Sequence, residues 1–145
     1  MPTIIITKIK GVSIMNCPDE TRLDSALSKW QKEHPGKYVS HRVGDDSERQ
    51  TDRTFRDACK DTSGVLEVSM PIARDIHRED LRCVRKPLLA ALDVEYMRAD
   101  ERGDALEKSR IAALKQALRD VTADPRIETA QTPEALKLVW PDVLA

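Results

Sequence analysis

The sequence predicts an α+β protein, with a small ββαβ N-terminal part followed by an extended arm and a helical hairpin. Three observations lead to this class. The first forty residues hold short β-branched runs around one amphipathic segment. The second half holds two long amphipathic segments with a short connection, which is typical of an antiparallel helical pair. The 145-residue chain has only 2 Trp, 2 Tyr and 1 Phe, so an aliphatic core is expected.

The N-terminal hairpin is predicted from residues 3–9 and 11–16. Both runs are rich in β-branched side chains, and Lys10 and Gly11 form a turn signal between them. Residues 18–21 then supply capping and acidic first-turn positions for a helix. The apolar residues of that helix recur at helical spacing: Leu23, Ala26, Leu27 and Trp30.

This first helix is expected to stop near His34, because Pro35 disfavours the helical conformation of the residue before it and Gly36 suits a turn. Residues 38–43 alternate and predict a third strand. The polar segment that follows is predicted to be a linker over 44–51. The chain is therefore expected to comprise a ββαβ domain over 1–43, this linker, and a mainly helical region over 52–145.

Within the helical region, residues 52–60 predict a short helix, and residues 64–70 predict a strand or extended arm. A long amphipathic helix is predicted to start at residues 69–71, with Ser69 as its cap or Pro71 in its first turn, and Pro87 is expected to kink or split it near residues 85–86. Its apolar or small residues are predicted to form one continuous stripe: Ala73, Ile76, Leu81, Val84, Leu88, Ala91 and Leu92.

Gly103 is expected to end the long helix, and residues 105–121 predict its antiparallel partner. Asp124 and Pro125 break the pattern. A short final helix is predicted from residues 132–138 before Trp140 and Pro141.

Composition restricts the function classes. The formal net charge of −1 argues against a protein that binds nucleic acid through a global basic excess. The N-terminal apolar run is too short for a signal peptide or a membrane span, so a cytosolic protein is expected. Cys17, Cys59 and Cys83 are odd in number and widely spaced, which predicts free thiols.

No catalytic motif is present: the sequence has no Gly-rich phosphate loop, no G-x-S-x-G and no H-E-x-x-H. We therefore expect a non-enzymatic protein without a metal or cofactor. A three-ligand metal site of His34, His41 and Cys17 is one interpretation of their spacing, but surface turn histidines explain it better. His77, on the apolar side of the long helix, is more typical of a hydrogen-bonded boundary histidine than of a catalytic base.

Two features are candidate partner-binding sites. The first is a stripe of cations spaced by four on the long helix: Arg74, Arg78, Arg82 and Lys86. Asp75, Glu79 and Asp80 are interleaved with it, so an exposed face of mutual ion pairs is the simpler interpretation. The second feature is Trp140 with Pro141, which either anchors a partner or docks on the protein's own helical hairpin.

The C-terminal half resembles phage tail-assembly chaperones and tail-fibre-assembly proteins. Those proteins share an R-x-x-L-L-x-x-x-D helix, a second helix with K/R-Q-A-L-R-D-hydrophobic, an Asp-Pro and a late Trp-Pro. The matching positions here are Arg85, Leu88, Leu89 and Asp93, then residues 115–121, Asp124 with Pro125, and Trp140 with Pro141. Val94 follows Asp93 where those proteins usually carry Trp, and the predicted ββαβ part lies outside the resemblance.

The resemblance implies a morphogenesis protein that acts by contact with phage tail, fibre or other virion proteins. Such a chaperone works in the host cytoplasm during assembly. A minor virion component, such as an adaptor, collar or fibre-attachment protein, is the alternative, and a homo-oligomer is compatible with both. A nucleic-acid-binding regulator that uses the Arg74–Lys86 stripe is the less favoured third reading, and it predicts salt-dependent DNA binding.

Overall fold

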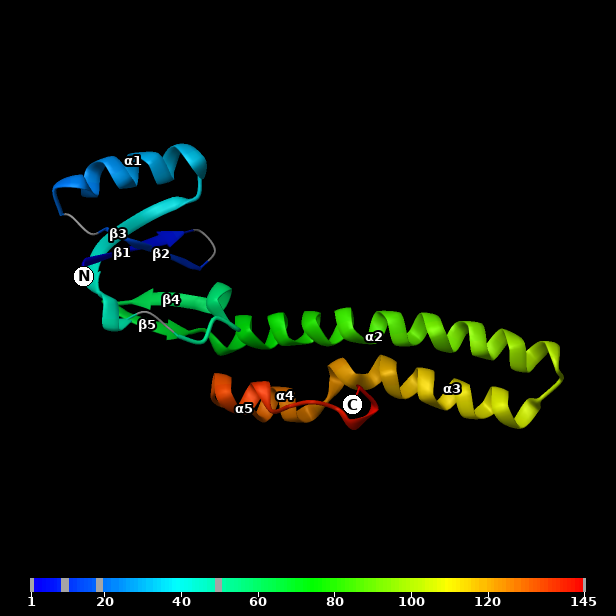
Figure 1. Ribbon diagram of the computed structural model, residues 1–145. Helices are drawn as coiled ribbons and strands as arrows, with labels where there is room; N and C mark the ends of the chain where they lie inside the picture. The colour runs from blue at the N-terminus through cyan, green and yellow to red at the C-terminus, as the bar shows by residue number, and fades with distance from the viewer. Residues whose placement is uncertain (1, 9–10, 18–19, 49–50, 145) are drawn as a thin grey trace. The chain divides into compact units, whose positions relative to one another are not determined.

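The computed structural model describes residues 2–8, 11–17, 20–48 and 51–144 (Figure 1). The chain forms two compact units, residues 1–69 and residues 70–145. The first contains two small antiparallel sheets and one helix, and the second contains only helices and short 3₁₀ turns. The α+β class predicted from the sequence is confirmed.

A three-stranded antiparallel sheet forms the centre of the first unit. Its strands are β1 (Pro2–Lys8), β2 (Val12–Asn16) and β3 (Tyr38–Asp45), in the order β2-β1-β3. Ile5 of β1 pairs with Ile14 on one side and with Arg42 on the other. The predicted hairpin and third strand are therefore present, although Ile9 of the predicted first strand and Lys10 of the predicted turn lie outside the described residues.

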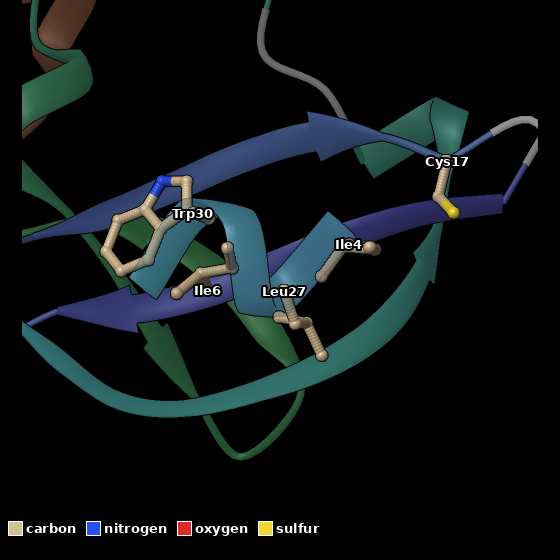
Figure 2. Packing of buried hydrophobic residues seen from close by; sticks show 5 residues of the cluster. All are labelled: Ile4, Ile6, Cys17, Leu27 and Trp30. Carbon is tan, nitrogen blue, oxygen red and sulfur yellow. The ribbon is translucent and has the colours of Figure 1, made fainter. Parts of the chain in front are cut away.

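Helix α1 (Leu23–Glu33) follows a 3₁₀ turn (Glu20–Arg22) and covers one face of this sheet. Because successive side chains of a strand point to opposite faces, Ile4 and Ile6 of β1 face α1, where Leu27 and Trp30 cover them (Figure 2). Cys17 completes this buried cluster. The helix ends at Glu33, as the sequence predicted.

The opposite face of the sheet is covered by a β-hairpin of β4 (Cys59–Thr62) and β5 (Val65–Val68). Ile5 packs there against Cys59 and Leu66. The predicted helix over 52–60 is therefore wrong, since only residues 56–58 form a 3₁₀ turn. Ser63 and Gly64 both have positive φ, 53° and 89°, and this two-residue loop favours strand pairing over a helix.

The described part of the segment predicted to be a linker, residues 44–48 and 51, lies inside the first unit, and residues 49–50 lie outside the described residues. Strand β3 continues to Asp45, and residues 46–48 form a 3₁₀ turn. Arg42 of β3 holds this segment in place through two ion pairs. Its Nη2 lies 2.6 Å from Glu48 Oε2, and its Nε lies 2.7 Å from Asp61 Oδ2. The division between compact units falls instead between Ser69 and Met70.

The second unit is built on α2 (Met70–Glu101), a continuous helix of 32 residues that packs against α3 (Ala105–Asp120) (Figure 1). Pro87 lies inside α2 without splitting it, contrary to one of the two outcomes predicted for this residue. Contacts with α3 hold the helix, so the single hydrogen bond that proline removes does not end it. Gly103, with φ 71°, forms the predicted end of this helix.

After α3, a 3₁₀ turn (Val121–Ala123), α4 (Pro125–Thr129), α5 (Pro133–Lys137) and a last 3₁₀ turn (Asp142–Leu144) complete the unit. Asp124 and Thr132 cap α4 and α5 through hydrogen bonds from backbone N–H groups. Asp124 and Pro125 were predicted only to end the helical pattern of residues 105–121. In the structure they also begin α4. Among the described helices, none has both the length and the apolar character needed to cross a membrane.

Candidate functional site

Arg74, the first cation of the predicted stripe, holds two parts of the helical unit together. Its Nε donates to the backbone oxygen of Ile127 at 3.1 Å, and its Nη2 donates to that of Ala130 at 2.9 Å. These carbonyls lie at the end of α4, where a helix leaves its last carbonyls without intrahelical partners. Arg74 therefore caps α4 from α2, and only 17% of its side chain is exposed.

The next two cations of the stripe also have internal partners. Arg78 pairs with Asp75, at 3.2 Å, and with Glu128. Arg82 Nη1 lies 2.9 Å from Glu79 Oε2. This part of the stripe is therefore a chain of mutual ion pairs, and it does not form the open row of positive charge that a nucleic-acid-binding regulator would need.

Lys86, the last cation, makes no ion pair with any described residue. It lies in a shallow groove of about 460 Å³ on one side of α2. Arg85 borders the same groove and donates to the backbone oxygen of Arg119 at 2.7 Å, so it caps the end of α3. The remaining lining residues are Arg82, Leu89, Ala90 and Asp93. This groove contains one unpaired cation, which is too little to define a ligand.

The C-terminal segment presents an exposed apolar patch that we call the C-terminal patch, made of Leu138 and Trp140. The exposed fractions of these residues are 82% and 41%, whereas Val139 and Pro141 are buried. The backbone oxygen of Val139 accepts a 2.9 Å hydrogen bond from Nε2 of the buried His77. Buried Val139 and Pro141 thus fix the backbone on both sides of Trp140.

The patch corresponds in part to the Trp140 and Pro141 site that the sequence predicted. Trp140 is neither fully docked on the helices nor free of them, since somewhat less than half of it is exposed. Leu138 was not predicted as part of this site. Along residues 138–141, exposed Leu138 and Trp140 alternate with buried Val139 and Pro141. This alternation is the signal that could have identified Leu138.

A second apolar surface lies on the outward face of α2, and we call it the outer stripe. The sequence predicted a single stripe along this helix. The structure divides it, because Ala73 and Leu81 are fully buried whereas Val84 and Val94 are 36% and 49% exposed. The exposed members of the outer stripe are Cys83, Val84, Pro87, Leu88, Ala90, Ala91, Val94 and Met97.

The histidines of the first unit have structural roles. His34 stacks on Trp30, with ring centroids 4.4 Å apart, and His41 Nδ1 lies 2.8 Å from the hydroxyl of Tyr38. Cys17 is buried in the core beneath α1. Among the described residues, no group of His, Cys, Asp and Glu is arranged to hold a metal ion.

Comparison with protein-family models, curated proteins and solved structures finds no match to this chain. The C-terminal patch and the outer stripe are the candidate contact surfaces of the helical unit, because large apolar side chains are exposed in each of them.

Proposed function

We propose that this protein is a non-enzymatic phage morphogenesis protein that acts as a chaperone for a tail or tail-fibre subunit. The observation that carries the proposal is the C-terminal patch, in which Leu138 and Trp140 stay exposed on an anchored backbone. The C-terminal Trp-Pro is also part of the resemblance to tail-assembly and tail-fibre-assembly proteins. The patch would bind an apolar surface of the subunit until that surface is covered in the finished tail.

The chemistry of the patch supports reversible contact. Burial of one large apolar side chain contributes about 1.5–3 kcal/mol, so two such residues provide a modest affinity. Tryptophan is enriched among residues that dominate binding energy. Because buried Val139 and Pro141 fix the backbone between and beside them, little further ordering is needed on binding.

The alternative is a minor virion component that uses the same patch permanently. Quantitative mass spectrometry of purified phage particles and infected-cell lysate separates the two. A chaperone is expected to be abundant in lysate and absent from particles. A reproducible copy number per particle would instead identify a virion component and refute the chaperone proposal.

The role of the patch is tested by Leu138→Ala and Trp140→Ala in infected cells. We expect fewer complete tailed particles with each variant, while the amount of soluble variant stays unchanged. Leu106→Ala is the matched control, because Leu106 is 86% exposed but lies on α3, outside the C-terminal patch. Equal particle numbers for Leu138→Ala, Trp140→Ala and Leu106→Ala would contradict the proposal.

A further inference from the structure

The outer stripe of α2 leaves one side of a long helix apolar and uncovered, and we infer that it pairs with the outer stripe of a second copy of this chain in antiparallel orientation. Its members extend from Cys83 to Met97, and its central positions between Asp80 and Arg98 are uncharged. Glu95 lies at the edge of the same face, four residues after Ala91. Helices with an apolar stripe at spacings of three and four pack together along that stripe. The proposed occupant is a second α2.

The pattern along the centre of the stripe is self-complementary. Successive positions three or four residues apart lie on one face of a helix. On this face they are Asp80, Val84, Pro87, Ala91, Val94 and Arg98. When two copies are placed antiparallel with their Leu89 residues at the same level, residues equally far from position 89 lie opposite each other. Asp80 then pairs with Arg98, Val84 with Val94, and Pro87 with Ala91.

The ends of the stripe determine the orientation of the partner. Asp80 and Arg98 are both exposed, and neither forms an ion pair with a described residue. Antiparallel pairing brings Asp80 of each copy to Arg98 of the other, which gives two ion pairs of opposite charge. Parallel pairing would place Asp80 against Asp80 and Arg98 against Arg98, and such like-charge contacts are unfavourable.

The middle of the stripe allows close approach of the two helices. Ala90 and Ala91 have small side chains, and Pro87 leaves the Cys83 carbonyl without its usual helical donor. The stripe from Asp80 to Arg98 is roughly 27 Å long, at 1.5 Å per residue. A single helix pair of this length buries less than the standard interface of about 800 Å² per partner, so we expect a weak dimer that dissociates on dilution.

Disulfide formation between introduced cysteines tests the orientation directly. Two proteins are prepared, Val84→Cys and Val94→Cys, each also carrying Cys83→Ser; Cys17 and Cys59 remain because both are buried. In the antiparallel pair, residue 84 of one copy lies opposite residue 94 of the other. Two copies of residue 84 are then separated by roughly 15 Å along the helices, which is too far for a disulfide.

We expect a disulfide-linked dimer only when the Val84→Cys and Val94→Cys proteins are mixed before oxidation. Disulfide dimers of either protein alone would show parallel pairing and overturn the proposal. Absence of the mixed dimer, with unchanged helical content by circular dichroism, would overturn it as well, because the two positions would then not meet.

Exchange of the terminal charges gives a second measurement. Arg98→Asp should raise the dissociation constant by about tenfold or more in sedimentation velocity, because Asp80 then faces a like charge. Adding Asp80→Arg to this variant should restore the dimer. Lys29→Asp is the matched control, since it makes the same charge change on α1. An equal effect of Lys29→Asp and Arg98→Asp, or failure of the double variant to recover, would refute the charge pairing and the orientation inferred from it.

Discussion

The imidazole of His77 donates from Nε2 to the backbone oxygen of Val139, 2.9 Å away, and thereby ties α2 to the C-terminal segment. His77→Phe keeps an aromatic ring of similar size but leaves this carbonyl without its partner. We expect a loss of about 1–3 kcal/mol in the free energy of unfolding. Urea unfolding followed by circular dichroism measures it. His41→Phe removes only an exposed hydrogen bond with Tyr38 and should cost less than about 1 kcal/mol.

Arg74 and Arg82 belong to the same row of cations but should respond differently to substitution. Arg74→Met removes two hydrogen bonds to the end of α4, and we expect destabilisation of about 1–3 kcal/mol. Arg82→Met removes one exposed ion pair with Glu79 and should change stability by less than about 1 kcal/mol. Equal losses in urea unfolding would contradict the capping role of Arg74.

Glu48 makes the stability of the first unit depend on pH. Hydrogen bonds from Arg42, and then from the backbone N–H of Asp45, hold the pKa of the Glu48 carboxyl below its ordinary value of 4.5. At pH values between the folded and unfolded pKa of Glu48, the unfolded state binds more protons than the folded state. The stabilisation that Glu48 contributes is therefore present above pH 4.5 and is lost as the pH falls through the folded pKa.

The predicted result is a smaller loss of stability on acidification for Glu48→Gln than for the unaltered protein. Urea unfolding at several pH values from about 6 to about 3 gives the comparison. Glu33→Gln is the control, because Glu33 is exposed and forms no ion pair with the part of the chain that the structure describes. A pH profile of Glu48→Gln that matches the unaltered protein would contradict the role of Arg42.

Gly11 and Gly36 share positive φ values, 76° and 71°, but differ in their surroundings. A Cβ at Gly11 would lie 3.0 Å from the backbone oxygen of Asp57, whereas a Cβ at Gly36 would have no neighbour within 4 Å. Gly36→Ala should therefore cost about 1–2 kcal/mol through backbone strain alone. Gly11→Ala should cost at least about 1 kcal/mol more, as measured by urea unfolding.

Local patterns predicted most of the fold. The isoleucine-rich β1, the helix that ends before Pro35 and the caps at Gly103 and Thr132 each carry a signal within a few residues. Strand β5 lies within residues 64–70, which were predicted to be a strand or extended arm, but its partner β4 was missed because Phe55 and Cys59 have helical spacing. Cys59 is buried because it begins β4, which pairs with β5 across the turn at residues 63–64 and packs against Ile5. Spacing within one segment does not predict such contacts between segments.

The candidate site was less predictable because it depends on which side of α2 is covered. Leu81 and Val84 follow the same apolar pattern, yet Leu81 is buried and Val84 is partly exposed. Likewise, nothing in the spacing of Arg74 or Arg85 reveals that their side chains cap helices more than thirty residues away. Such long-range contacts are set by tertiary packing.

The central position of β1 has a consequence for the order of events during synthesis. Its isoleucines need partners on both sides, and β2 follows at once, whereas β3 is translated only after α1. At 5–20 residues per second, the interval between Ile6 and Val43 is roughly 2–7 s. Throughout that interval the nascent hairpin has an apolar strand with one open edge, and such an edge is a template for pairing with another chain.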